Sequence, residues 1–183
     1  RVTLAEDQAP QVEQLQVNIG MAQGMLCAFG SLYININANK KQLEGTDAEG
    51  PGVYRLTDTT GDDQYDKIEY LLPMSDQAGE HGPHALILSP DGKKIYLCSG
   101  NQTDVPAAAT GGPVPRHWGE DHLLGRMPDG RGFMADRQAP GGWICRMDPD
   151  GTNVELIANG FRNEYDIAFN PAGELFTYDA DME

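Results

Sequence analysis

A strand–turn–strand pattern occurs twice in this chain of 183 residues, in two copies of matching layout. The first copy covers residues 85–98 around the turn Ser-Pro-Asp-Gly, and the second covers residues 167–178 around Asn-Pro-Ala-Gly. Proline presets φ and glycine tolerates positive φ, so both tetrapeptides predict tight turns between paired strands. Ser89 and Asn170 begin the two turns, and we expect equivalent hairpins in two neighbouring structural repeats.

A second pattern repeats in the same order. Residues 52–56 (Gly-Val-Tyr-Arg-Leu) resemble residues 143–147 (Trp-Ile-Cys-Arg-Met), and an acidic turn and a closing apolar strand follow each of them. Residues 28–34 read as a shortened third copy of the first pattern. Each unit therefore holds four strands, an inner pair and then an outer pair, which is typical of a β-propeller blade. The predicted fold class is all-β, and the predicted architecture is a β-propeller.

The number of units bears on the domain organisation. The chain holds about two full units and the inner strands of a third, whereas a propeller closes with four to eight blades. We therefore expect a lead-in segment at residues 1–20 and a partial propeller at residues 21–183, as a fragment of a longer polypeptide. Residues 101–142 form a long insertion rich in Gly, Pro, Ala, His and Arg, which we expect to have little regular structure and to cover the channel mouth.

Charge and apolar content exclude several classes of protein. Thirteen Lys and Arg against 28 Asp and Glu give a net charge of −15, which argues against nucleic acid and against an anionic membrane surface as partners. The longest mostly apolar stretch, residues 25–34, is about half of a membrane span, so we expect no transmembrane helix. Cys27, Cys98 and Cys145 lie in apolar runs without metal-ligand spacing, and we expect them to be buried.

Three stretches resemble the soluble glucose/sorbosone dehydrogenases, which are six-bladed quinoprotein propellers. They are Glu80-His81 with the apolar strand and turn that follow, Gly-Phe-Arg-Asn at residues 160–163, and Ala-Gln-Gly-Met-Leu at residues 22–26. The sequences of residues 79–84, 141–146 and 176–183 resemble those of the large planctomycete-type membrane-bound dehydrogenase-like proteins, which often carry a haem-c domain. The resemblance implies a six-bladed parent, of which this chain covers two and a half to three blades.

The resemblance implies a role for five residues near the pyrroloquinoline quinone (PQQ) of these enzymes. His81 takes the position of the general base, which suits an imidazole whose ordinary pKa lies near neutrality. Arg162 takes the position of the catalytic cation that stabilises charge on the reduced quinone, and Asn163, Gln23 and Glu80 take positions of further cofactor contacts. The alternatives are a structural turn histidine at position 81 and a surface arginine paired with a neighbouring acid at position 162.

Two further features stay open at the level of sequence. Asp179, Asp181 and Glu183 alternate and would share one face of a strand, so they predict either a calcium site or a solvated acidic rim. His84 departs from the family, which tends to have a small residue there, and it is either a second active-site group or a residue that blocks the pocket.

The resemblance implies a periplasmic or otherwise exported dehydrogenase that oxidises a sugar or alcohol by hydride transfer to the bound quinone. Its expected partners are the substrate, the remaining propeller blades or a second chain, and a cytochrome-type electron acceptor, with haem c in the parent protein outside this chain. The alternatives are a non-catalytic propeller that binds carbohydrate or a protein partner, and a structural propeller arc in a cell-surface assembly.

Overall fold

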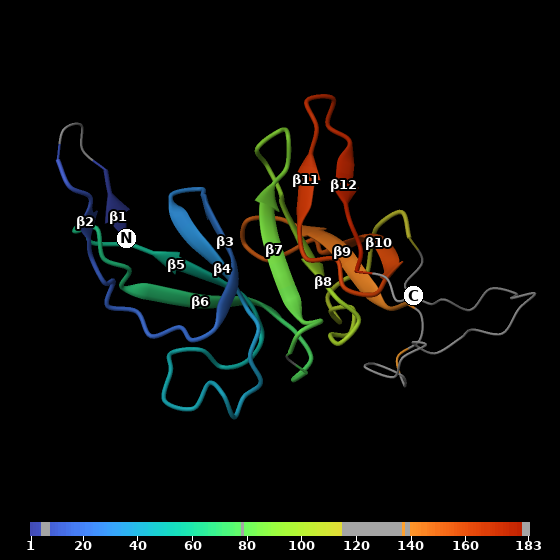
Figure 1. Ribbon diagram of the computed structural model, residues 1–183, viewed down its shortest axis with the longest axis horizontal. Helices are drawn as coiled ribbons and strands as arrows, with labels where there is room; N and C mark the ends of the chain where they lie inside the picture. The colour runs from blue at the N-terminus through green and yellow to red at the C-terminus, as the bar shows by residue number, and fades with distance from the viewer. Residues whose placement is uncertain (5–7, 78, 115–136, 138–139, 181–183) are drawn as a thin grey trace, which may run out of the picture.

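Every regular element of the structure is a β-strand, as the sequence predicts (Figure 1). The computed structural model describes residues 1–4, 8–77, 79–114, 137 and 140–180. Within these ranges the structure holds no helix that is long and apolar enough to cross a membrane.

Two four-stranded antiparallel sheets make up most of the chain, each ordered in space as in the sequence. The first sheet contains β3 (Ala22–Ala28), β4 (Ser31–Ile36), β5 (Gly52–Thr57) and β6 (Lys67–Pro73). The second contains β7 (Pro83–Leu88), β8 (Ile95–Ser99), β9 (Gly142–Met147) and β10 (Glu155–Phe161). A third sheet begins with the pair β11 (Ile167–Phe169) and β12 (Leu175–Thr177).

The first strands of the three sheets lie next to one another. Strand β3 packs against β7, and β7 contacts β11, while the later strands of each sheet extend outward (Figure 1). Four-stranded meanders that meet along their first strands are the blades of a β-propeller. The described part of the chain therefore contains two complete blades and the inner pair of a third, as the repeats predict.

The two Gly-containing turns are equivalent hairpins in neighbouring blades, which confirms the prediction from the repeat. In the first, the Ser89 N–H donates to the Lys94 carbonyl (2.8 Å) and the Gly92 N–H donates back to the Ser89 carbonyl (2.9 Å). In the second, the Asn170 N–H donates to the Glu174 carbonyl at 3.0 Å. The two similar turn sequences therefore form the same backbone hydrogen bond across the hairpin.

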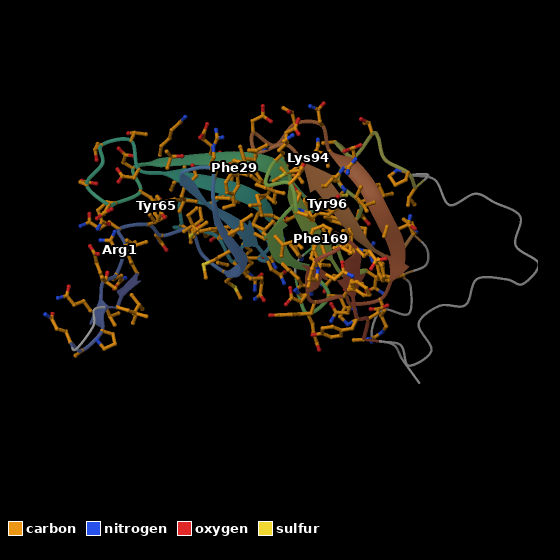
Figure 2. All side chains as sticks on the ribbon, turned by 90° about the horizontal axis from the view of Figure 1, so that it is seen from above. Arg1, Phe29, Tyr65, Lys94, Tyr96 and Phe169 are labelled. Atoms are coloured by element: carbon orange, nitrogen blue, oxygen red, sulfur yellow. The ribbon has the colours of Figure 1, made fainter. Side chains whose placement is uncertain are left out.

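The main core lies between the first and second blades. Its buried side chains include Tyr33, Val53, Leu72, Leu97, Trp143, Cys145 and Leu156. The Trp143 indole is fully buried and satisfies its N–H by donating to the Thr103 carbonyl at 2.8 Å. Between the second and third blades, Tyr96 meets Phe169 edge to face with ring centroids 5.0 Å apart (Figure 2).

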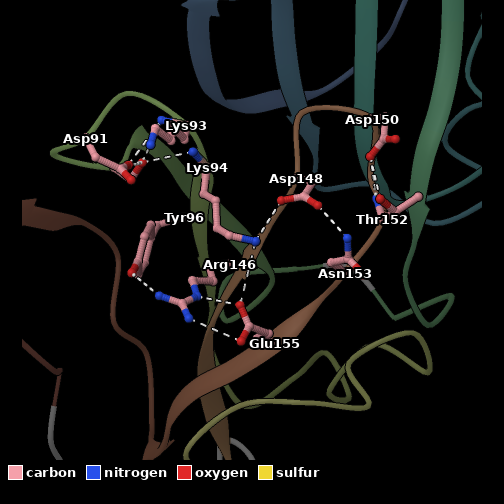
Figure 3. Close-up of polar contacts among 11 residues, drawn as sticks. Asp91, Lys93, Lys94, Tyr96, Arg146, Asp148, Asp150, Thr152, Asn153 and Glu155 are labelled. Atoms are coloured by element: carbon pink, nitrogen blue, oxygen red, sulfur yellow. Dashed lines mark hydrogen bonds and ion pairs between the residues drawn. The ribbon is translucent and has the colours of Figure 1, made fainter.

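Charged side chains tie the outer strands of the second blade together. The Arg146 guanidinium on β9 forms a two-pronged contact with Glu155 on β10, at 2.6 and 3.1 Å, and also donates to the Tyr96 hydroxyl (Figure 3). The Lys94 ammonium lies 2.7 Å from the Asp148 carboxylate. These hydrogen bonds and ion pairs satisfy the charged side chains on the partly exposed side of the second blade.

One expectation from the sequence needs correction. Cys98 and Cys145 are buried as expected, but Cys27 is exposed, because it shares the solvent-facing side of β3 with Met25. The lead-in segment contains β1 (Val2–Thr3) and β2 (Gln11–Val12), which pair as a short antiparallel hairpin. Strands of only two residues are too short to show an alternating pattern, so this hairpin is not predictable from the sequence.

The insertion at residues 101–142 begins beside His81. The Gln102 N–H donates to the His81 carbonyl at 3.1 Å, and further along Gly111 pairs with Glu155 at the outer strand of the second blade. Residues 115–136 and 138–139 lie outside the described residues. That the whole insertion covers the channel mouth therefore stays a prediction.

Candidate functional site

A pocket of about 310 Å³ lies where the first strands of the blades meet. It is lined by Met21, Gln23, Asn37, Gln42, Gly79, Glu80, His84 and Tyr165. A second hollow of about 200 Å³ continues along β3 and β7 and shares Gln23 and Tyr165 with the first. Among the residues that line the two hollows, no side chain is a Lys or an Arg, and the remaining polar groups are amides, a hydroxyl, an imidazole and carboxylates.

Two buried asparagines of the first blade, one on β4 and one directly after it, hold the segment that leads into β7 and the start of that strand. The Asn35 amide nitrogen donates to the His84 carbonyl at 2.9 Å, and the Asn37 side chain both donates to the Gly79 carbonyl and accepts from the Gly79 N–H. A Cβ at Gly24 would lie 2.3 Å from the His84 carbonyl oxygen, so the two backbones are in close approach. The backbone of this segment is therefore fixed from the first blade.

His81 is 2% exposed and precedes β7. Its Nδ1 lies 2.7 Å from the Asn101 side-chain oxygen, which can only accept a hydrogen bond. This contact puts the proton of the neutral ring on Nδ1 and the lone pair on Nε2. His81 is not among the residues that line the pocket, whereas the adjacent Glu80 and the nearby His84 are.

His84 joins three of the residues around the pocket. Its Nε2 lies 2.9 Å from the Asn163 side-chain oxygen, and its ring packs on Tyr165 with centroids 4.4 Å apart. The Tyr165 hydroxyl in turn donates to the Gln23 side-chain oxygen at 3.1 Å. Burial lowers the pKa of His84, and the nearby His81 lowers it further, so the imidazole is neutral at neutral pH.

The Arg162–Asn163 segment lies against the His81 segment. The Asn101 N–H donates to the Arg162 carbonyl at 2.8 Å, while its side chain contacts His81. The Asp179 carboxylate accepts the backbone N–H groups of Arg162 and Asn163, each at 2.7 Å, and the Arg162 guanidinium donates to the Ala180 carbonyl. Segments about 80 residues apart in the sequence are thus brought together.

The acidic residues near the end of the chain were predicted to bind calcium or to form a solvated rim. Asp179 is exposed and is engaged with the two backbone N–H groups, which is a structural role. Asp181 and Glu183 lie outside the described residues. Across the part of the chain that the structure describes, no group of three or more His, Cys, Asp or Glu side chains is placed to hold a metal ion.

Sequence reasoning missed Tyr165 and misjudged Glu164. Tyr165 is 49% exposed at the pocket, and its only signal in the sequence is its place two residues after Asn163. Glu164 is one of the neighbouring acids that a surface Arg162 could pair with, but it is fully buried, and its two carboxylate oxygens have no hydrogen-bond partner in the described structure. Burial raises the pKa of Glu164 to about 9.

No family model matches the chain. No curated protein matches it either. Among solved structures, the chain is similar to a provisionally assigned gluconolactonase, at 14% identity and a TM-score of 0.39. The alignment covers 92% of this chain and 59% of that structure, so the chain spans well under two thirds of its length. The blade topology, and not this distant likeness, is what establishes the propeller architecture here.

Proposed function

We propose that this chain is part of a β-propeller dehydrogenase that oxidises a sugar or an alcohol, with His81 as the general base. The observation that carries the proposal is the meeting of the His81 and Arg162 segments, which Asn101 and Gln102 join through three hydrogen bonds beside the pocket. In such an oxidation the carbon gives up a hydride while a base takes the proton of its hydroxyl group. The same proposal includes an exported location and a cytochrome-type electron acceptor.

The environment of His81 supports its role as a base. With Nδ1 donating to the Asn101 oxygen, the tautomer of the ring is set and Nε2 is the nitrogen that takes a proton. When the ring becomes charged, the Nδ1–H bond to the same oxygen becomes a charge-assisted bond and stabilises the imidazolium. Asn101 therefore acts as the orienting partner of the base.

The described residues fit the quinone only in part. Pyrroloquinoline quinone carries three carboxylates, and the pocket lining offers amides and a carboxylate but no Lys or Arg. Arg162 is the one cation of the segments implicated here, enough for one carboxylate or one quinone oxygen. Calcium likewise finds no acidic cluster within the described ranges. The acid–base role of His81 therefore rests on its own contacts with Asn101.

The experiment is dye-linked oxidation by the full-length protein supplied with PQQ and calcium. We expect His81→Ala to lose sugar or alcohol oxidation by at least about a hundredfold, the usual scale for loss of a general base, while it still binds the quinone. Arg162→Ala should weaken quinone binding as well. Lys40→Ala, on a loop of the first blade, is the matched control and should oxidise as the wild type does. Unchanged oxidation by His81→Ala would reject the proposed base.

A second candidate function is a propeller that binds carbohydrate without catalysis. The pocket favours it in one respect: Gln23, Asn37 and Gln42 are planar neutral amides that line the pocket together with Tyr165, with no Lys or Arg among the lining residues. Such a set suits hydroxyl groups and an apolar ring face better than a tricarboxylate. Wild-type protein that binds sugars but neither binds the quinone nor oxidises them would favour this candidate.

A further inference from the structure

His84 contacts groups from all three blades, although it belongs to the second. Its carbonyl is held by Asn35 of the first blade, and its imidazole bonds to Asn163 ahead of the third. Its ring also packs on Tyr165, whose hydroxyl reaches back to Gln23 on β3. The imidazole is 2% exposed, so its orientation is set by these contacts and not by solvent.

The hydrogen bond to Asn163 fixes both partners. The amide oxygen that faces His84 can only accept, so Nε2 carries the proton of the neutral ring. Nδ1 is then a bare acceptor, and it is buried without a hydrogen-bond partner in the described structure. In return, the Asn163 oxygen is committed to His84, which leaves the NH₂ end of that amide turned away from the imidazole.

We propose that His84 is a positioning residue: it holds Tyr165, which lines the pocket, and Asn163, which is not among the lining residues, in the arrangement with which the pocket binds a neutral polyhydroxy ligand. The identity of the ligand rests on the proposed function, whereas the positioning role rests on the contacts of His84. The His84 imidazole makes two contacts that can be removed separately: an N–H donor bonds to Asn163, and a flat ring packs on Tyr165. Two substitutions at position 84 can therefore remove one contact at a time.

His84→Phe keeps a ring against Tyr165 and removes the donor, while His84→Gln keeps a donor and removes the ring. We would titrate the full chain with D-glucose and with sorbitol, using saturation-transfer NMR, and record the side-chain amide signals of Asn163 and the ring signals of Tyr165. We expect His84→Phe to bind both probes at least about tenfold more weakly, the scale of one lost buried hydrogen bond, and to shift the Asn163 signals. Cys27→Ser, at an exposed site, should match the wild type.

His84→Gln should keep the Asn163 signals close to their wild-type positions and shift those of Tyr165. In the wild type, the ¹⁵N shifts of the His84 ring should report a protonated Nε2 and a bare Nδ1. The inference is overturned if Asn163 and Tyr165 keep their wild-type signals in both variants, or if both variants bind the sugars as the wild type does. If the wild type binds neither probe, the proposed function fails, and the Asn163 and Tyr165 signals alone decide the positioning role.

Discussion

Glu164 is the residue whose chemistry differs most from its ordinary behaviour in water. Its side chain is fully buried against Gly142, where a Cβ would lie only 2.4 Å from the Glu164 Oε2 atom. A carboxylate in such a place loses its hydration, so the neutral acid is favoured and the pKa rises to about 9. Because Glu164 lies between Asn163 and Tyr165, its protonation state bears on the backbone that carries both.

Replacing Glu164 by Gln should remove a pH dependence of stability. The folded pKa lies near 9, above the ordinary carboxyl value, so the native state keeps a proton that the unfolded state releases. The wild type should therefore lose stability as the pH rises from about 4.5 towards 9, whereas Glu164→Gln should not. The free energy of unfolding of the wild type should fall, relative to the variant, by up to about 1.4 kcal/mol per pH unit, which is about 4 kcal/mol between pH 5.5 and 8.5, measured by urea unfolding at both pH values. Glu44→Gln, at an exposed site, is the control, and an equal pH slope in Glu164→Gln and wild type would contradict the expectation.

At the candidate site, the sequence indicates which segments matter but not which atoms face the pocket. The resemblance pointed to Gln23, Glu80 and His81, and the structure brings the first two into the pocket lining. It could not predict that Asn35 and Asn37 are buried, because an alternating strand suggests that its polar positions face solvent. Their burial depends on contacts with the next blade, which are non-local.

At the level of elements, strand and turn positions follow from local signals. Alternation predicts the strands of the first blade, and Pro-Asp-Gly predicts a hairpin between residues 85 and 98, which the structure confirms. The boundaries are harder to predict: the apolar strand that closes the second copy of the second pattern is β10, which continues past its apolar residues to Phe161. The register between β9 and β10 shifts twice, and such irregularities leave no clear mark in the sequence.

The contact between the first two blades depends on a missing side chain at Gly24. A Cβ there would lie 2.3 Å from the His84 carbonyl and 3.0 Å from the Leu86 nitrogen, and both are backbone atoms that cannot rotate away. We expect Gly24→Ala to destabilise the fold by about 2–3 kcal/mol, because β3 and β7 must move apart. Urea unfolding measures this cost.

The matched control for Gly24→Ala is Gly111→Ala. At Gly111 a Cβ would meet only the Glu155 side chain at 3.6 Å, which is an ordinary contact. This variant should change stability by less than about 0.5 kcal/mol. If the two variants unfold at the same urea concentration, the close approach of β3 and β7 does not occur in solution.

At the scale of the whole molecule, the excess of acidic residues lowers the stability of the native state through repulsion between like charges. With a net charge of −15, the native state concentrates like charges, and salt screens their repulsion. The described ion pairs join side chains that are mostly partly exposed, which water still reaches, so each pair contributes little and its weakening by salt has a small effect. We expect the melting temperature to rise between 0.02 and about 0.3 M NaCl at pH 7, and a fall would show that the ion pairs dominate.

The arrangement of three blades around one pocket can itself be tested by energetic coupling. Gln23 and Tyr165 lie 142 residues apart in sequence and on the first and third blades, yet the Tyr165 hydroxyl donates to the Gln23 oxygen at 3.1 Å. This bond forms only if the residues ahead of the third blade reach the first blade across the second. A double-mutant cycle therefore measures whether the two blades are in contact. We expect Gln23→Ala and Tyr165→Phe to be coupled by about 0.5–1 kcal/mol in the free energy of unfolding, because the bond is partly exposed. Gln23→Ala combined with Tyr96→Phe, whose side chains make no contact with each other in the described structure, should be additive. Additivity in both pairs would mean that the third blade does not reach the first.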